Sequence, residues 1–282
     1  MMIAECKKNL NIMTKIKGSC VLITGGASGI GRIMGRMALE RGARCLVVWD
    51  INADSIASVE AEFSSLGRVK GYRVDVSDNN SVEECYATTR KECGDVDILI
   101  NCAGIVRGNA TFDKQTVQDI DLTLAINTAA PMKVALQVLP SMLERNVGHI
   151  CNIASAAGMI SNPKMSVYAA SKWGVIGWSD SVRIELKQRK SKVRVTTVAP
   201  YYINTGMFDG VRSRLFPILK PEPTARKILN AIERNVDFRG IPWSSHFIRL
   251  CQGLLPTAWF DTIFGDWVGI YSTMDNFTGR KK

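Results

Sequence analysis

The sequence predicts an α/β fold: a doubly wound parallel sheet with helices on both faces, followed by a helical C-terminal extension. Short apolar runs alternate with longer amphipathic segments through most of the 282 residues. Each interval is long enough for a helix, as in βαβ units. The runs occupy residues 20–24, 44–50, 68–75, 97–101, 149–155 and 193–200. Such sheets bind ligands at the carboxyl ends of their strands, so the residues that end each run are the candidates for a site.

The pattern predicts one domain over residues 1–240, with the loop 200–221 included, and an aromatic-rich extension over 241–282 that packs on it. We find no internal repeat and no low-complexity linker in the sequence. Hydrophobic residues make up 46% and charged residues 22%, which is ordinary for a globular protein. A chain of this length can bury a sizeable core without disulfides or metals.

The cysteines and histidines argue against a metal site. None of the eight cysteines forms a C-x-x-C pair, and neither His149 nor His246 has a Cys or Glu at ligand spacing. Several cysteines lie in apolar runs, which indicates buried free thiols in a reducing compartment. We therefore expect a cytoplasmic protein without a metal.

The sequence also argues against nucleic-acid binding and against membrane spans. Part of the net charge of +10 is clustered in residues 183–194, but no nucleic-acid motif accompanies the cluster. We interpret it as the basic end of a helix, where the helix dipole favours cations. Residues 1–18 contain no apolar stretch of secretory length, and no uncharged apolar stretch reaches about 18 residues.

A glycine-rich turn follows the first apolar run. The segment from Thr24 to Gly31 reads TGGASGIG and leads into a helix-compatible stretch. Glycines let the backbone approach a pyrophosphate, and a helix N-terminus offers free N–H groups. The segment therefore predicts a Rossmann-type dinucleotide site, with candidate residues Gly25, Ser28, Gly29, Ile30 and Gly31.

The second run ends at Asp50, 25 residues after Gly25. An acidic residue near this offset accepts hydrogen bonds from the adenosine ribose and repels a 2′-phosphate, so Asp50 favours NAD over NADP. The alternative is that Asp50 caps the next helix, although Asn52 offers a cap as well.

Further motifs follow in order: Asn101-Cys102-Ala103-Gly104, Ser155, and Tyr168 with Lys172. Together with the T-G-x-x-x-G-x-G turn, they resemble the short-chain dehydrogenase/reductase family over about residues 18–235. The resemblance implies four catalytic residues. Ser155 would hold the substrate oxygen, Tyr168 would be the general acid or base, Lys172 would bind the nicotinamide ribose and lower the Tyr168 pKa, and Asn127 would hold a proton-relaying water.

The resemblance also implies further cofactor contacts. Asp75 would lie near the adenine ring, and Thr205 would reach the carboxamide. The remaining implied contacts are Val76, Asn101, Ala103, Gly104, Pro200 and Ile203. The family's usual Pro-Gly is Pro200-Tyr201 here, which departs from the pattern.

The chemistry is reasonable from the residues alone. Tyr168 and Lys172 are four residues apart and share a helix face. A free tyrosine has a pKa of about 10, which a nearby ammonium and an oxidised nicotinamide can lower. A sensor that binds the dinucleotide without turnover would not need Asn127, Ser155, Tyr168 and Lys172 together. A serine hydrolase is excluded by the absence of a G-x-S-x-G turn.

Residues 200–208 and the LVVWDIN and IASAAG segments resemble the retinol dehydrogenase and 17β-hydroxysteroid dehydrogenase branch. That branch acts on apolar alcohols and ketones; a reductase of long-chain 3-keto lipids is the alternative. We expect an apolar substrate beside Tyr201, Tyr202, Met207 and Phe208, with Leu215 and Phe216 further along. The expected assembly is a homodimer or homotetramer.

The C-terminal extension contains an apolar stripe at helical spacing: Trp259, Phe260, Ile263, Phe264, Trp267, Val268 and Tyr271. Three interpretations remain open. The stripe packs on the body or on another subunit, it roofs the substrate pocket, or it contacts a membrane. Peripheral membrane contact is the least favoured, because Asp261 and Asp266 lie on the opposite face where a membrane binder carries Lys and Arg.

Overall fold

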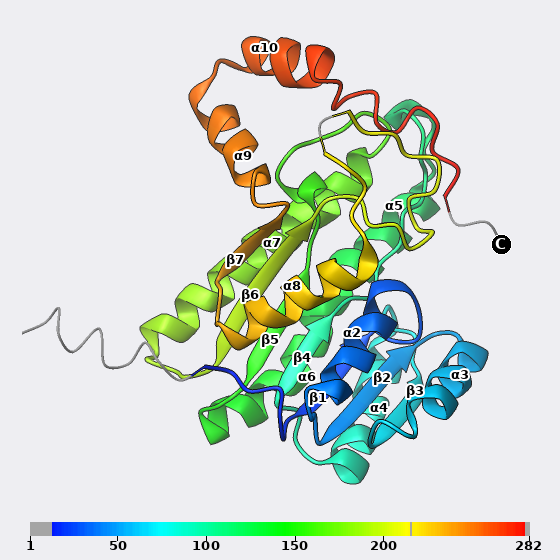
Figure 1. Ribbon diagram of the computed structural model, residues 1–282, viewed down its shortest axis with the longest axis vertical. Coiled ribbons are helices and arrows are strands. Elements are labelled where there is room, and N and C mark those ends of the chain that lie inside the picture. The colour runs from blue at the N-terminus through cyan, green and yellow to red at the C-terminus, as the bar shows by residue number, and fades with distance from the viewer. Residues whose placement is uncertain (1–12, 215, 280–282) are drawn as a thin grey trace, which may run out of the picture.

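Seven parallel strands form one sheet at the centre of the molecule (Figure 1). The computed structural model describes residues 13–214 and 216–279, so Leu215 and the N-terminal residues 1–12 lie outside the described part. The strand order is β3-β2-β1-β4-β5-β6-β7. The strands are β1 (Cys20–Thr24), β2 (Cys45–Asp50), β3 (Val69–Arg73), β4 (Ile98–Asn101), β5 (His149–Ile153), β6 (Arg194–Pro200) and β7 (Phe238–Ile241).

The strands confirm the predicted α/β fold and follow the apolar runs closely. The run at 44–50 becomes β2, and the run at 149–155 becomes β5 with its last two residues in the following loop. Strand β7 was not predicted, because its four residues FRGI carry too few apolar side chains to stand out. The strand order reverses between β1 and β4, and this is where sheets of this kind bind ligands.

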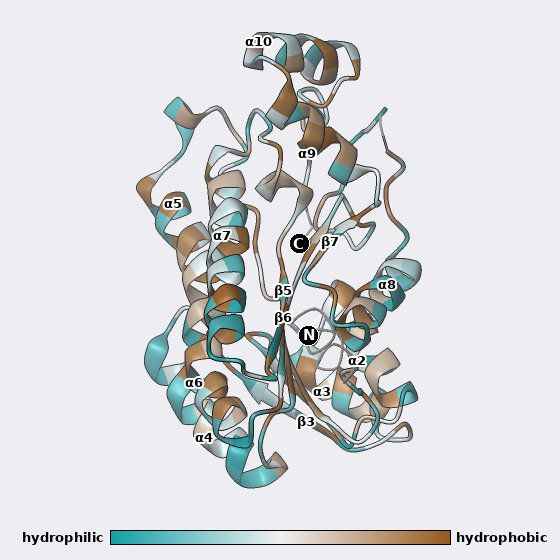
Figure 2. Ribbon diagram, turned by 90° about the vertical axis from the view of Figure 1, so that its left-hand side faces the viewer, coloured by the Kyte–Doolittle hydropathy of each residue, from teal (hydrophilic) through white to brown (hydrophobic). Residues whose placement is uncertain are grey.

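Helices cover both faces of the sheet (Figure 2). On one face, α2, α3 and α8 share a core with alternate residues of the strands, Ile23 and Val48 among them. On the other face, α4, α6 and α7 pack on the intervening residues, such as Leu22 and Val47. The helices are α2 (Gly29–Glu40), α3 (Ala53–Phe63), α4 (Asn79–Cys93), α6 (Ala130–Arg145), α7 (Ser166–Gln188) and α8 (Pro221–Glu233).

A long helical segment precedes β5. Helix α5 (Val117–Leu124), the π-helical turn η2 (Ala125–Ala129) and α6 run on without a break. By length and composition alone, the span Val117–Arg145 is apolar enough to cross a membrane, which the sequence analysis did not expect. Its inner residues Val134 and Val138 pack in the core against the sheet, and this accounts for much of its apolar character.

The C-terminal residues form an arm beyond the carboxyl ends of the strands (Figure 1). The arm contains α9 (Ser245–Leu254), α10 (Thr257–Phe260) and the π-helical segment η4 (Asp261–Trp267). Its end folds back on the loop after β6, where Arg212 N donates to Thr273 O (3.2 Å) and Thr278 N to Asp209 O (2.9 Å). The division of the chain at residue 240 remains a prediction.

Candidate active site

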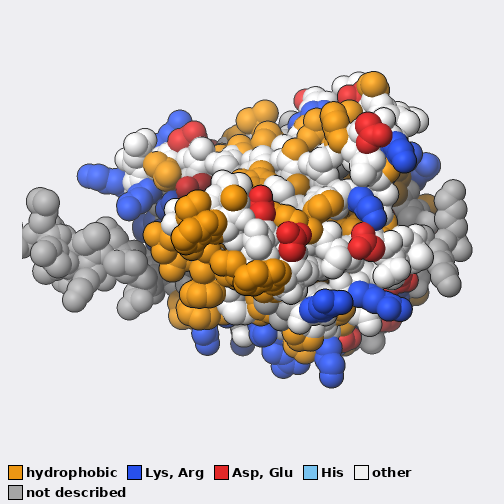
Figure 3. Space-filling view, turned by 90° about the horizontal axis from the view of Figure 1, so that it is seen from above, with side chains coloured by type: hydrophobic (Ala, Val, Ile, Leu, Met, Phe, Trp, Pro, Cys, Tyr) orange, Lys and Arg blue, Asp and Glu red, His pale blue; other side chains and the backbone are white. Residues whose placement is uncertain are grey.

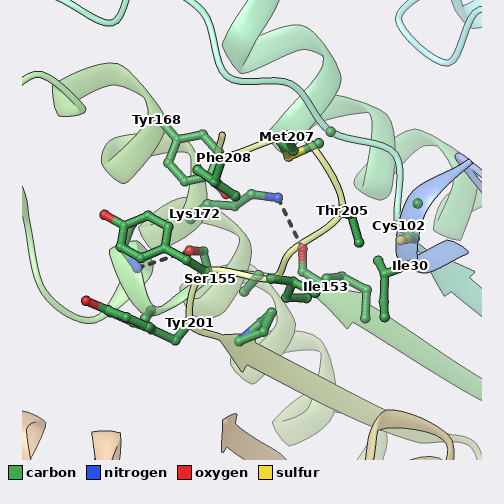
Figure 4. Close-up of a pocket in the computed structure, with 18 of the residues that line it drawn as sticks. Ile30, Cys102, Ile153, Ser155, Tyr168, Lys172, Tyr201, Thr205, Met207 and Phe208 are labelled. Atoms are coloured by element: carbon green, nitrogen blue, oxygen red, sulfur yellow. Dashed lines mark hydrogen bonds between the residues drawn. The ribbon is translucent and has the colours of Figure 1, made fainter. Parts of the chain in front are cut away.

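One open pocket, of about 1300 Å³ with its mouth included, lies at the carboxyl ends of β1, β4, β5 and β6 (Figure 4). It brings together most of the residues that the sequence analysis selected. These are Gly25, Ser28, Gly29, Ile30, Gly31, Ala103, Gly104, Ser155, Tyr168, Lys172, Pro200, Tyr201, Tyr202, Ile203, Thr205, Met207 and Phe208. The other selected residues, Asp50, Asp75, Val76, Asn101 and Asn127, are not part of its lining.

The glycine turn forms one end of the pocket. Gly25 follows β1 with φ +67°, and a Cβ there would lie 2.8 Å from Cα of Ala103. A side chain would therefore separate the segments that follow β1 and β4. Thr24 Oγ1 holds these two segments together, because it accepts hydrogen bonds from the N–H of Cys102 (3.1 Å) and Ala103 (3.2 Å).

Helix α2 begins at Gly29 beside this turn, so its first N–H groups have no carbonyl partner within the helix. Ser28, the residue before it, gives the helix no side-chain cap. Free N–H groups at a helix start bind anions such as a pyrophosphate. A Cβ at Gly31 would overlap the carbonyl oxygen of Gly25, so the turn has room only for glycine there. We call the glycine turn 24–31 together with the free N–H groups at the start of α2 the glycine cradle. Its open backbone and N–H groups fit a dinucleotide.

The structure separates the two interpretations of Asp50. Asn52 caps α3, since its side chain accepts a hydrogen bond from Ser55 N at 2.8 Å. Asp50 instead accepts from Ala27 N at 3.1 Å through Oδ2 and from Asn52 N at 3.2 Å through Oδ1. Its carboxylate thus braces the glycine turn. Asp50 is only half-buried, so its carboxylate oxygens can accept further hydrogen bonds from a ligand at this edge of the sheet.

Three other selected residues have structural partners. Asp75 Oδ1 accepts from the N–H (2.9 Å) and hydroxyl (2.6 Å) of Ser77. Val76 packs in the core. The buried Asn101 side chain donates to Asn152 Oδ1 at 2.8 Å and joins β4 to β5. These contacts shape the edge of the sheet around the pocket.

Ser155, Tyr168 and Lys172 converge inside the pocket (Figure 4). Ser155 follows β5, and its Oγ accepts from Ala157 N at 3.1 Å. Tyr168 and Lys172 occupy the first two turns of α7, and each is only 5% exposed. The Lys172 ammonium donates to Ile153 O at 3.1 Å and lies 5.8 Å from the centre of the Tyr168 ring.

Burial dominates the electrostatics of this group. It raises the pKa of Tyr168 above its usual value, and hydrogen bonding with Ser155 opposes the rise. Burial also lowers the pKa of Lys172 to about 8. The protein alone therefore does not lower the Tyr168 pKa as expected from the sequence. A phenolate at this position requires added positive charge nearby, which an oxidised nicotinamide carries.

Asn127 lies in the π-helical turn η2 and is fully buried. Its Oδ1 accepts from Ile105 N (2.8 Å), and its Nδ2 donates to Ile105 O (2.9 Å) and to Ser171 Oγ (3.2 Å). The side chain therefore ties the segment after β4 to α7. Both amide hydrogens are used in these bonds, whereas Oδ1 keeps a second lone pair for another donor. Turns of π-helix often occur at functional sites.

The selected aromatic side chains form the substrate side of the pocket. Tyr202 and Phe208 pack with Tyr168, and the rings of Tyr168 and Phe208 meet edge to face with centres 6.0 Å apart. Tyr201 stacks edge to face on Phe216 at 5.4 Å. These aromatic side chains are apolar except for the hydroxyl groups of the two tyrosines.

Sequence reasoning missed part of this wall. Ser245 and Ile248 of α9 line the pocket together with Ile270, so the arm contributes to the roof and also packs on the body. Asn162 lines it too; its Nδ2 donates to Tyr202 Oη (3.1 Å) and Thr273 Oγ1 (2.7 Å). The other missed lining residues are Cys102, Ile153, Ala154, Ala156, Ala157 and Ile160, whereas Phe216 lines the pocket as expected. The IASAAG motif next to Ser155 was the available signal for the alanines.

The described residues, 13–214 and 216–279, contain no group of three or more His, Cys, Asp or Glu side chains placed to hold a metal ion. The pocket offers the phenol of Tyr168, the hydroxyl of Ser155, the ammonium of Lys172 and the free N–H groups at the start of α2.

Comparisons with known proteins agree with this geometry. The family model described as short chain dehydrogenase matches residues 19–215. The mouse protein named epidermal retinol dehydrogenase 2 is 35% identical over 95% of this chain and 87% of its own. Estradiol 17-beta-dehydrogenase 11 of Macaca fascicularis is 32% identical over 86% of this chain and 80% of its own.

The fold has close counterparts among solved structures. A Burkholderia phymatum short chain dehydrogenase/reductase in complex with NAD has a TM-score of 0.77 at 23% identity, over 86% of this chain and 96% of its own. A metagenomic short-chain oxidoreductase in complex with NADP has a TM-score of 0.67 at 27% identity, over 78% of this chain and 93% of its own. The chain belongs to the short-chain dehydrogenase/reductase family of oxidoreductases, in the branch of the retinol and 17β-hydroxysteroid dehydrogenases.

Proposed function

We propose that this chain is an NAD(H)-dependent oxidoreductase that interconverts an alcohol and its carbonyl on a retinoid-, steroid- or lipid-like substrate. One observation carries the proposal: Ser155, Tyr168 and Lys172 line the same pocket, and the rest of its substrate side is mostly apolar. The names of the relatives, a retinol and an estradiol dehydrogenase, support an apolar substrate.

Each polar group has a distinct task in this proposal. The Tyr168 hydroxyl gives a proton to the substrate oxygen during reduction and takes one during oxidation. The Ser155 hydroxyl holds that oxygen. Lys172, with a pKa of about 8, is mostly charged near pH 7 and stabilises the phenolate form of Tyr168. A bound nicotinamide would supply the hydride chemistry.

The glycine turn and the start of α2 indicate which residues would hold the cofactor. The N–H groups at the start of α2 would hold the pyrophosphate, with the glycines Gly25, Gly29 and Gly31 giving it room. Asp50 would accept from the adenosine ribose, and this is the basis for proposing NAD over NADP. Asp75, Val76, Asn101, Pro200, Ile203 and Thr205 complete the proposed set.

The decisive experiment follows NADH absorbance while the purified chain is offered retinol, hydroxysteroids and long-chain 3-keto lipids. Turnover of retinol or a steroid supports the proposal, whereas turnover of keto lipids alone supports the alternative reductase. Dinucleotide binding without turnover of any of them would identify a sensor. The proposed homodimer or homotetramer and the proposed cytoplasmic location are tested by light scattering and by fractionation.

A further inference from the structure

Asn162 joins three segments that form the substrate side of the pocket. It lies in the stretch between Ser155 and Tyr168. Its Nδ2 donates to Tyr202 Oη (3.1 Å) in the loop after β6 and to Thr273 Oγ1 (2.7 Å) in the arm. The hydroxyl oxygens of Tyr202 and Thr273 are themselves 3.1 Å apart. We call Asn162, Tyr202 and Thr273 the amide cluster.

The hydrogen bonds of the amide cluster have one consistent direction. The Thr273 hydroxyl donates to Ile270 O at 2.9 Å, so its oxygen accepts from Asn162 and from Tyr202. The Tyr202 oxygen accepts from the second Asn162 hydrogen. A turned amide would place Oδ1 against the Thr273 oxygen, whose hydrogen is already used. Tyr202 is 8% exposed and Thr273 is 2% exposed, so a broken bond would leave a buried polar group without a partner.

The amide cluster is connected to the roof of the pocket. Thr273 bonds the carbonyl of Ile270, and the Ile270 side chain lines the pocket. The end of the arm also lies directly on the loop after β6, so closely that a Cβ at Gly210 would overlap Asn276 O. The loop and the end of the arm are therefore packed together, and Asn162 joins both of them to the segment that carries the catalytic group.

Two other kinds of contact hold the arm, and neither fixes its position as a buried amide does. Hydrophobic side chains gather on this end of the molecule (Figure 3), but apolar attraction has no direction. An ion pair between Lys164 Nζ and Asp275 Oδ1 (2.8 Å) also joins the segment before α7 to the arm, with side chains 35% and 54% exposed. Exposed pairs of this kind contribute little. The buried amide cluster therefore sets where the arm lies over the pocket.

We propose that Asn162 is a positioning residue that holds the roof of the substrate pocket in place. This inference rests on the proposed alcohol oxidoreductase function. Asn162 acts through its partners, because it fixes Tyr202 directly and Ile270 through Thr273. A long apolar substrate that reaches the roof binds more weakly without Asn162. A short substrate beside Tyr168 and a dinucleotide in the glycine cradle are not affected.

The test uses Asn162→Leu and Thr273→Val, which keep the size of each side chain and remove its hydrogen bonds. KM and kcat are measured with NAD for a four-carbon and a twelve-carbon secondary alcohol. We expect KM for the long alcohol to rise about tenfold, as for one buried hydrogen bond lost. We expect kcat, the affinity for NAD and KM for the short alcohol to stay within about twofold of the parent chain. Thr273→Ser keeps the hydroxyl and should restore the parent values.

A double variant and a matched control test the assignment to the amide cluster. Asn162→Leu/Thr273→Val should raise KM little more than Asn162→Leu alone, because both changes remove the same bond. Multiplied effects would overturn the inference. Asp275→Asn breaks the exposed ion pair on the same part of the arm, and it should leave KM for the long alcohol unchanged.

A readout without turnover separates this inference from the proposed function. Hydrogen exchange of residues 270–279 should be faster in Asn162→Leu than in the parent chain and in Asp275→Asn. Unchanged exchange, an equal rise of KM for both alcohols, or a joint fall of kcat and NAD affinity overturns the inference. If the parent chain oxidises no alcohol, the proposed function fails, and faster exchange in Asn162→Leu still supports Asn162 as the anchor of the arm.

Discussion

His149 should make the fold sensitive to acid. It is fully buried at the start of β5, with Nδ1 2.9 Å from Thr14 Oγ1 and Nε2 2.8 Å from Thr196 Oγ1. The Thr14 hydroxyl donates to Asn235 Oδ1 at 2.6 Å, so it accepts from Nδ1–H, and Nε2 is left to accept from Thr196. Burial, together with the nearby charge of Arg194, lowers the pKa of His149 to about 3.

The direction in which stability changes with pH follows from the His149 pKa in the folded and in the unfolded chain. The folded state keeps the ring neutral down to about pH 3, whereas the unfolded chain protonates it near the usual value of about 6.5. Stability is therefore complete above pH 6.5 and is lost as the pH falls towards 3. Between pH 7 and pH 5 the free energy of unfolding should fall by about 2 kcal/mol from this group.

The assay is urea unfolding followed by circular dichroism at both pH values. The chain has two histidines, and the other, His246, is partly exposed, with a pKa that burial also lowers. The variant His149→Gln should therefore keep most of its own stability between pH 7 and pH 5. If it loses as much as the parent chain, or if the parent shows no loss, the assignment of the acid sensitivity to His149 is wrong.

Three further predictions concern the pocket. Tyr168→Phe should lower turnover by about 10²–10⁴-fold while NAD still quenches tryptophan emission, and near-normal turnover would place the proton donor elsewhere. Gly31→Ala should weaken NAD binding by about tenfold or more, because the new Cβ forces the turn away from Gly25; titration calorimetry decides, and an unchanged affinity contradicts the proposed cradle. In a series of secondary alcohols, kcat/KM should rise severalfold with each added carbon, at about 0.8 kcal/mol per methylene, until the pocket is full. A flat series would refute an apolar pocket.

The sheet and the catalytic group could be predicted because their signals are local. The strands β1, β2 and β4 are apolar runs that end in Thr24, Asp50 and Asn101. Tyr168 and Lys172 are neighbours on one helix face at a spacing of four. The short strand β7 gave no comparable signal. The dinucleotide cradle was predictable for the same reason, since the turn stands between a strand and a helix.

The substrate side of the pocket depends on contacts between distant segments. Amphipathicity shows that the arm has an apolar face but not what that face touches, so the positions of Ile248 and Ile270 in the pocket could not be predicted. The raised pKa of Tyr168 was missed because it results from burial, which the sequence did not show. The hydrogen bonds between the Asn127 amide and the backbone of Ile105 likewise depend on where Ile105 lies in the fold.

The C-terminal arm folds back onto the loop after β6, and this sets the order in which parts of the pocket can form during synthesis. The glycine cradle and the catalytic group are all encoded before β7, whereas Ile270 lines the pocket and Thr278 bonds the loop at Asp209. Domains fold from the N-terminus as they leave the ribosome. The cofactor half can thus form on the ribosome before the residues that complete the substrate wall have been made. During that interval the nascent protein could bind a dinucleotide but would have no finished cavity for an apolar molecule.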